Sequence, residues 1–162
     1  MIEHHSRRQP IHMPPIKRYG RPLIFYVTVC AKDRKRILAC DRIHSLLVDA
    51  WADAIRYQVG RYVVLPDHVH LFASPSGLDD EIVSKWVAYW KRIVSCRAKD
   101  LTPIWQRDGW DTQIRDRRGY EAKGEYVRMN PVRHGLVRTP DEWPYQGTLN
   151  ELGSWFNRTA GR

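Results

Sequence analysis

The stretch RYVVLPDHVHLFAS, residues 61–74, contains two apolar segments that meet at a Pro-Asp step. β-Branched and aromatic residues favour an extended backbone, and Pro66 ends the first segment because proline brings no N–H to a strand ladder. We therefore predict two strands, over residues 61–66 and 68–74, joined by a hairpin-like turn.

The segments on either side of this pair alternate between strand and helix periodicity. Residues 23–29, LIFYVTV, and residues 110–115, WDTQIR, are predicted strands. Apolar residues recur at helical spacing after Asp41, a predicted N-cap, and again from about residue 79 to 98.

A third helical segment, DRRGYEAKGEYVRMN, ends at Asn130. We expect a break there because Pro131 disfavours helical geometry in the residue before it. The order strand, helix, strand, strand, helix, strand, helix predicts an α+β fold that is ferredoxin-like, with a mainly antiparallel sheet flanked by helices.

The composition predicts one folded domain. The chain has 162 residues, 43% of them hydrophobic, with seven Trp and eight Tyr, which argues against disorder. We expect a flexible basic arm at residues 1–21, the domain at 22–150 and a C-terminal tail at 151–162. Three cysteines without a C-x-x-C pair, and no stretch of membrane-spanning length, predict a cytoplasmic protein without a membrane partner.

His68 and His70 are one residue apart on a predicted strand, so both side chains project from one face, about 6.5–7 Å apart. Two imidazoles at this spacing can bind one metal ion; the alternative is a pair of ordinary hydrogen-bonded histidines. Asp67 either orients an imidazole or only forms the turn, and we favour the turn.

Tyr126 and Asn130 are four residues apart in GEYVRMNPVRHGL and therefore share a helical face. Asn130 could add an oxygen ligand, and Tyr126 could present its hydroxyl to a group that the metal polarises. The alternative is that Tyr126 only packs, as most helical tyrosines do. The remaining histidines show no metal-ligand spacing: His4, His5, His12, His44 and His134.

Together these motifs resemble the REP-associated tyrosine transposases, of the transposase family of single-tyrosine HUH (histidine–hydrophobic residue–histidine) nucleases. PDHVHLF is followed about 55 residues later by YVRMNPVRHGLV; IWQRDGWDTQIRD and DEWPYQGT are similar to further family segments. The resemblance covers residues 19–148.

The resemblance implies a nuclease and strand transferase that cuts single-stranded DNA beside hairpins through a 5′-phosphotyrosine. It implies Tyr126 as the nucleophile and His68, His70 and Asn130 as ligands of Mg²⁺ or Mn²⁺. A divalent ion would neutralise the phosphodiester and ease proton loss from a phenol, whose pKa is ordinarily near 10. We expect a nucleoid-associated protein that works as a monomer, although relatives exchange the tyrosine helix between two subunits.

The sequence departs from the family in two places. The closing W-P-x-S-S motif is here WPYQG, residues 143–147, which lacks both hydroxyls. Gly119 and Gly124 interrupt the tyrosine helix, which leaves Tyr126 less firmly held or makes the helix mobile.

The net charge of +9 and the pI of about 9.7 favour a polyanionic partner, nucleic acid ahead of an anionic membrane; the alternative is that the charge only aids solubility. Lys85, Tyr89 and Arg92 share one helical stripe that suits single-stranded DNA. Further basic residues that could clamp a hairpin stem are Arg18, Arg34, Lys35 and Arg36. All of these side chains could instead be solvated surface charges.

Three other functions compete with the nuclease. The first is a non-catalytic single-stranded or hairpin DNA-binding protein of the same fold, against which the presence of all the site residues argues. The second is an unrelated metal-dependent phosphoester hydrolase, which needs further ligands. The third is a nucleic-acid chaperone, which would tolerate His68→Ala and Tyr126→Phe.

Overall fold

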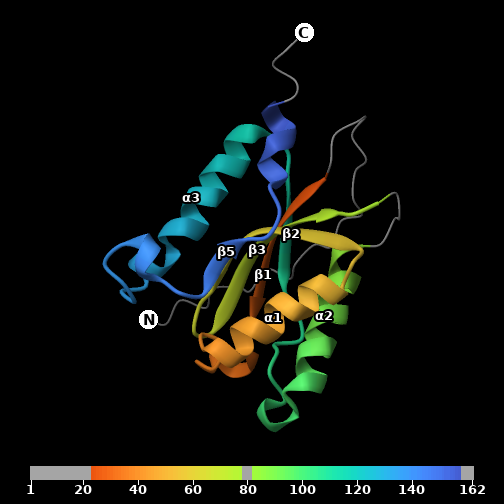
Figure 1. The fold of residues 1–162 in the computed structure, drawn as a ribbon, viewed down its shortest axis with the longest axis vertical. Helices are drawn as coiled ribbons and strands as arrows, with labels where there is room; N and C mark the ends of the chain where they lie inside the picture. Colours follow the sequence, from red (N-terminus) through yellow and green to blue (C-terminus); the bar gives the residue numbers. More distant parts are fainter. Residues whose placement is uncertain (1–22, 78–81, 158–162) are drawn as a thin grey trace, which may run out of the picture.

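The computed structural model describes residues 23–77 and 82–157. The expected arm at residues 1–21, including Arg18, lies outside the described residues. The elements follow in the order β1 (Ile24–Cys30), η1 (Lys32–Arg34), α1 (Asp41–Asp53), β2 (Tyr57–Val64), β3 (His68–Pro75), α2 (Val83–Arg97), η2 (Lys99–Leu101), β4 (Trp110–Ile114), α3 (Arg117–Arg133), η3 (Pro140–Glu142), β5 (Gln146–Thr148) and η4 (Leu152–Asn157) (Figure 1).

The strands form one antiparallel sheet in the order β4-β1-β3-β2-β5. Strand β3 lies between β1 and β2, and α2 leads from β3 to β4 at the edge, which is the split β-α-β arrangement. The predicted α+β, ferredoxin-like fold is therefore confirmed. The short edge strand β5 was not predicted, because its three residues, QGT, include a glycine and only one strand-favouring residue, Thr148.

Each face of the sheet carries its own core. Side chains such as Val69 and Leu71 pack with helices α1 and α2, among them Trp86 and Trp90. The opposite face carries Phe72 of β3. In Figure 1, α1 and α2 lie together and α3 lies apart from them.

Helix α3 belongs to the second face. Tyr26 and Phe72 of the sheet share this core with Val127 of α3. Strand residues alternate between faces, so His68 and His70 share the face of Phe72. The histidines therefore lie on the side of the sheet that α3 covers.

The expected helix break at Asn130 is wrong. Helix α3 continues through Pro131, which is buried, to Arg133. Pro131 lies in the last turn, where its missing N–H costs a single bond, and the His134 amide still donates to the Asn130 carbonyl at 3.0 Å.

Two smaller expectations also change. The N-cap of α1 is Cys40 rather than Asp41, which is the first helical residue. The predicted C-terminal tail begins with η4, where Leu152 is buried and Phe156 packs against the second core. The packed domain therefore extends at least to Phe156.

The helix glycines give a stability prediction. A Cβ on Gly124 would meet no atom within 4 Å, so Gly124→Ala should raise the free energy of unfolding by about 1 kcal/mol. A Cβ on Gly119 would lie 3.2 Å from Oδ1 of Asp116, the carboxylate that caps this helix, so Gly119→Ala should gain less. Urea unfolding of both variants checks this, and no gain for Gly124→Ala would mean that α3 is not fully formed there in solution.

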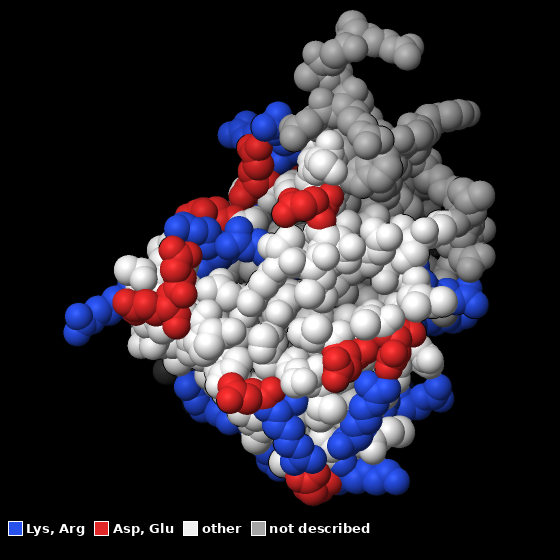
Figure 2. Space-filling model, viewed as in Figure 1, with Lys and Arg blue, Asp and Glu red and all other residues white. Residues whose placement is uncertain are grey.

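The charges visible on one face do not form a single basic stripe. Figure 2 shows Lys and Arg interspersed with Asp and Glu around the rim of this face, with few charges at its centre.

Within residues 23–77 and 82–157, no helix combines the length and the apolar character needed to cross a bilayer.

Candidate active site

The two histidines of β3 are buried side by side at the middle of the sheet. His68 is 5% exposed and His70 6%, and their ring centroids are 4.7 Å apart, edge to face. Strand β3 is flanked on both sides by neighbours, which fixes the register and therefore the direction of both rings.

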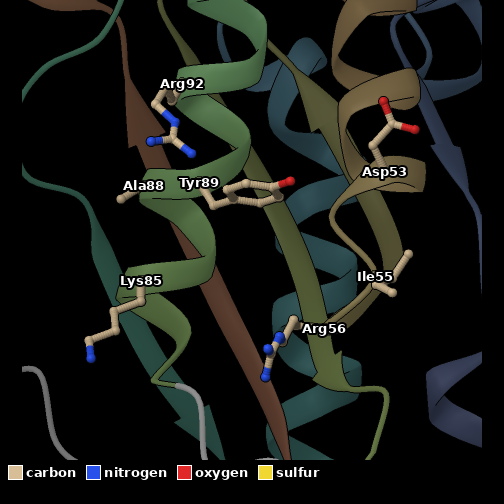
Figure 3. A pocket seen from close by; sticks show the side chains of 7 residues that line it. All are labelled: Asp53, Ile55, Arg56, Lys85, Ala88, Tyr89 and Arg92. Carbon is tan, nitrogen blue, oxygen red and sulfur yellow. The ribbon is translucent and has the colours of Figure 1, made fainter.

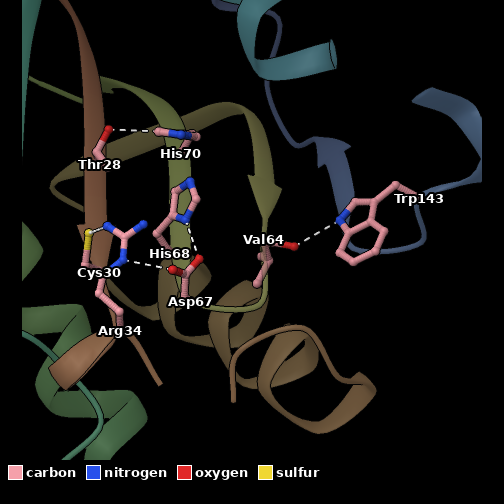
Figure 4. Close-up of polar contacts among 8 residues, drawn as sticks. All are labelled: Thr28, Cys30, Arg34, Val64, Asp67, His68, His70 and Trp143. Carbon is pink, nitrogen blue, oxygen red and sulfur yellow. Dashed lines mark hydrogen bonds and ion pairs between the residues drawn. The ribbon is translucent and has the colours of Figure 1, made fainter. Parts of the chain in front are cut away.

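Both Nδ1 atoms are held by partners on the protein. Nδ1 of His68 donates to Oδ1 of Asp67 at 2.7 Å, because a carboxylate can only accept. Nδ1 of His70 lies 2.8 Å from Oγ1 of Thr28 and 2.9 Å from the hydroxyl of Tyr26. Figure 4 shows the contacts of Thr28 and Asp67 with the two rings. The Nε2 atoms are thereby left for another partner, and Asp67 orients an imidazole, contrary to the turn role that we favoured.

Burial keeps both imidazoles neutral. It lowers the pKa of His70 to about 3, and the neighbouring positive charges act in the same direction. Burial also lowers the pKa of His68, although the Asp67 carboxylate opposes that change. The neutral ring is the form that binds a metal ion.

One stripe of α3 faces this pair. Tyr126, Asn130 and His134 lie at positions i, i+4 and i+8 along α3 and its C-cap. The Tyr126 ring lies 5.9 Å from that of His70, and the His134 ring 5.6 Å from that of His68. The ring contacts bring Tyr126 and His134 to the strand histidines, and Asn130 has the position between these two residues on the same helical stripe.

Asn130 meets a condition for a ligand. It is 1% exposed, and its Oδ1 is buried without a hydrogen-bond partner. An unpaired buried carbonyl is costly, and such an atom is explained when an ion or substrate binds it. Two neutral imidazoles and one amide oxygen fit a divalent ion such as Mn²⁺, although the donor types do not choose among metals.

Two cations surround the Tyr126 ring. The Arg133 guanidinium carbon lies 4.4 Å from the ring centroid and the Lys123 ammonium 5.8 Å from it. Tyr126 is 38% exposed, so a substrate can reach its hydroxyl. A positive charge nearby favours the binding of a phosphate group.

A second tyrosine lies at the same site. Tyr26 is 7% exposed, and its ring stacks on His70 with centroids 5.4 Å apart. Burial raises the pKa of its hydroxyl. Tyr26 is therefore a poorer nucleophile than the exposed Tyr126, and its hydroxyl serves to hold His70.

Sequence reasoning missed four residues of this site: Tyr26, Thr28, Lys123 and Arg133. Thr28 is directly opposite His70 in the β1–β3 register, which becomes visible only once the pairing is known. The sequence analysis did not assign His134 to the site, because the remaining histidines show no metal-ligand spacing. Its spacing of eight residues from Tyr126 was the available signal.

His134 does not complete a ready-made metal cluster. In the described part of the chain, no three His, Cys, Asp or Glu side chains are grouped closely enough to hold an ion. The further ligands that an unrelated metal-dependent hydrolase needs are therefore not found among residues 23–77 and 82–157.

The predicted DNA stripe of α2 lies elsewhere. Lys85, Tyr89 and Arg92 line a surface cavity of about 690 Å³ together with Asp53, Ile55, Arg56 and Ala88 (Figure 3). Tyr89 is 44% exposed, and Arg92 lies 5.6 Å from its ring centroid. The structure brings these three residues together but does not bring them to the histidines, because α2 covers the opposite face of the sheet.

The basic loop after β1 divides into two parts. Lys35 and Arg36 are exposed, as a DNA clamp requires. Arg34 instead bonds to Asp67 at 2.8 Å and to the Cys30 sulfur at 3.1 Å. Its guanidinium is therefore engaged with the residues that hold His68.

The altered closing motif has structural partners of its own. The indole of Trp143 donates to the Val64 carbonyl at 3.0 Å, and the Gln146 amide donates to the carbonyls of Pro140 and Trp143. A Cβ on Gly147 would lie 3.0 Å from the Tyr62 hydroxyl, so a larger residue would crowd that ring. The glutamine and glycine thus fit this chain's own packing.

Comparison with known proteins finds relatives among the REP-associated tyrosine transposases. No protein-family model matches the sequence. A REP-associated tyrosine transposase of Escherichia coli K12 is 34% identical over 107 residues, which cover 65% of this chain and 58% of the relative. A Haemophilus influenzae Rd protein assigned to the same family is 26% identical over 137 residues, 75% of this chain and 77% of that protein.

Solved structures of transposases have a fold similar to that of this chain. A REP-associated tyrosine transposase bound to a REP hairpin has a TM-score of 0.67 at 27% identity and matches 83% of this chain and 82% of its own. A Deinococcus radiodurans R1 protein assigned to the transposases has a TM-score of 0.50 at 16% identity, with 70% and 95% covered, and shows the fold alone.

A ferredoxin-like sheet with a His-x-His pair that faces a tyrosine-bearing helix is the arrangement that the sequence resemblance to the HUH transposases implies. This chain is similar to the REP-associated tyrosine transposases in sequence and in fold. The chain spans 58% of the length of the E. coli relative.

Proposed function

We propose that this protein is a metal-dependent endonuclease and strand transferase that acts on single-stranded DNA beside REP-like hairpins. The observation that carries the proposal is the contact between the Tyr126 ring and the His70 ring, which come from a helix and a strand distant in sequence. A hairpin partner is supported by the solved relative, which binds a REP hairpin.

In the proposed reaction, the Tyr126 oxygen forms a bond to the phosphorus of a DNA phosphodiester. The bond from phosphorus to the 3′ oxygen breaks, the phenol proton is lost, and the released strand keeps a 3′-hydroxyl. The product is a 5′-phosphotyrosine, from which a 3′-hydroxyl can later reseal the strand and restore the phenol.

The chain's own residues prepare this step. His68, His70 and Asn130 would hold Mg²⁺ or Mn²⁺, which when bound would neutralise charge on the phosphate. Arg133 and Lys123 place positive charge at the Tyr126 ring, which favours binding of the DNA phosphate there, and the sheet fixes both imidazoles. Incubation with a labelled single-stranded hairpin DNA and Mn²⁺ tests the proposal, and we expect a covalent adduct between the protein and the DNA.

We further infer that one subunit suffices for cleavage. Tyr126 and His70 belong to the same chain and are in ring contact, so a second copy is not needed to supply the tyrosine. A mixture of Tyr126→Phe and His70→Ala subunits tests this, since an exchanged helix would restore adduct formation and a monomeric site would not.

The stripe on α2 is proposed as a separate DNA contact. Lys85 and Arg92 flank the exposed Tyr89 ring, which suits phosphates beside an unpaired base. The logarithm of the DNA-binding constant falls linearly with the logarithm of the salt concentration, and we call the magnitude of this gradient the salt slope. Each lost phosphate contact lowers the salt slope of single-strand binding by about 0.7, so the double substitution Lys85→Ala, Arg92→Ala should lower it by about 1.4.

Fluorescence anisotropy with a single-stranded oligonucleotide at several salt concentrations measures that slope. Lys99→Ala, which removes an exposed lysine beyond the end of α2, is the matched control. An equal slope in the wild type and the double variant would assign Lys85 and Arg92 to solvated surface.

The alternative is a non-catalytic DNA-binding protein of the same fold. It predicts that hairpin binding is retained without any covalent product, whichever divalent ion is present. The site residues named above, with an orphaned Asn130 oxygen, favour the enzyme over this alternative.

A further inference from the structure

The loop after β1 is tied to the turn that carries Asp67. The amide of Ala31 donates to the Asp67 carbonyl at 2.8 Å, and the amide of Leu38 to the Pro66 carbonyl at 2.9 Å. These two main-chain bonds enclose the segment that contains Arg34. The position of Arg34 relative to Asp67 is therefore set by the backbone.

The backbone of this loop is unusual at Arg34 itself. Asp33 and Arg34 have φ angles of 55° and 54°, in the left-handed region that residues other than glycine seldom adopt. Such conformations persist where the surrounding structure imposes them, and they gather at functional sites. Here they place the Arg34 side chain against the Asp67 turn.

The guanidinium uses two of its donors in this position. Nε donates to Oδ2 of Asp67 at 2.8 Å, and the terminal nitrogen to the Cys30 sulfur at 3.1 Å. The other oxygen of Asp67 accepts from Nδ1 of His68 at 2.7 Å. Figure 4 shows the chain of contacts from Arg34 through Asp67 to the His68 ring.

Exposure falls along this chain of contacts. The side chain of Arg34 is 52% exposed, that of Asp67 20% and that of His68 7%. The carboxylate is fixed on one oxygen by Arg34 and orients the ring with the other. A carboxylate held in this way keeps hydrogen on Nδ1 and leaves Nε2 as an electron-pair donor.

We propose that Arg34 is a positioning residue for the metal-binding imidazole of His68, acting through Asp67, rather than a DNA contact. The inference rests on the proposed metal-dependent function. It separates Arg34 from its neighbours Lys35 and Arg36, which remain proposed DNA contacts.

The test is Mn²⁺ titration of the full chain by calorimetry, without DNA. Arg34→Ala should weaken Mn²⁺ binding by about 3- to 10-fold and Asp67→Ala by about 10- to 100-fold, the range for partners that orient a ligand. Lys35→Ala, from the same loop, should leave Mn²⁺ affinity unchanged. In the Asp67→Ala background, Arg34→Ala should have no further effect, because its route to the ring is gone.

A second measurement needs no metal. Long-range ¹H–¹⁵N spectra of the imidazoles report which His68 nitrogen carries hydrogen, and Arg34→Ala should shift that ring from the Nδ1–H form toward a mixture. Thermal unfolding verifies that each variant is folded. If Mn²⁺ does not bind the wild type but the tautomer still depends on Arg34, the metal proposal fails and the positioning role holds.

The opposite pattern overturns the inference. Mn²⁺ affinity and a His68 tautomer that are both unchanged in Arg34→Ala would remove the positioning role. If the same variant lowered the salt slope of DNA binding as Arg36→Ala does, Arg34 would be a DNA contact after all.

Discussion

Tyr126→Phe is expected to abolish the covalent adduct with hairpin-bearing single-stranded DNA while leaving DNA binding intact. Only the hydroxyl is removed, and the ring that contacts His70 and Arg133 remains. Loss of a nucleophile costs about 10⁶-fold in well-studied hydrolases, so we expect cleavage to fall by at least about 10⁴-fold. Denaturing gel electrophoresis of labelled DNA with the protein and Mn²⁺ measures both the adduct and the cut strand.

Two further tyrosines make this experiment specific. Tyr120→Phe changes a ring of the same helix that packs on Phe72 and Phe156, and should form the adduct normally. Tyr26→Phe removes a hydroxyl that contacts His70 and should slow the reaction without preventing the adduct. An adduct that survives in Tyr126→Phe but vanishes in Tyr26→Phe would transfer the nucleophile to Tyr26.

The strand pairing was predictable because its signals are local. The segment from residue 61 to 74 carries both the β-favouring residues and the proline that separates two strands. Alternation along a strand then places His68 and His70 on one face without knowledge of the rest of the fold. The same local reasoning placed Tyr126 and Asn130 on one helical face.

The rest of the site depends on facts that are not local. Pro131 is tolerated in α3 because it is buried in the last helical turn, which no propensity rule for the residue before proline can anticipate. The continuous helix puts His134, its C-cap, on one stripe with Tyr126. Tyr26 and Thr28 reach His70 only through the pairing of β1 with β3.

The basic residues illustrate a different limit. A helical stripe of Lys85, Tyr89 and Arg92 is evident from spacing alone, but which face of the sheet the helix covers is decided by packing. Arg34 resembles its neighbours in the KDRKR run, and only the structure separates its contact with Asp67 from the exposed Lys35 and Arg36. Charge in a sequence therefore does not distinguish a DNA contact from an internal bond.

His70→Ala is expected to weaken Mn²⁺ binding by more than about 100-fold, because removal of even an orienting partner costs 10- to 100-fold. His68→Ala should do the same, and Asn130→Leu should weaken binding less, since it removes one neutral oxygen. The change in melting temperature on adding Mn²⁺ measures this. An excess of about 100 times the dissociation constant stabilises the wild type by about 2.7 kcal/mol, and chelation with EDTA should reverse that gain.

The control for this prediction is a histidine on the other face of the sheet. His44 on α1 bonds to the Tyr62 hydroxyl at 2.8 Å, so His44→Ala should leave the Mn²⁺-induced shift unchanged. A shift that persists in His70→Ala but disappears in His44→Ala would move the metal site away from β3. Persistence in all variants would mean that Mn²⁺ binds elsewhere, and the unpaired Asn130 oxygen would then need another partner, for which a substrate hydroxyl is the natural candidate.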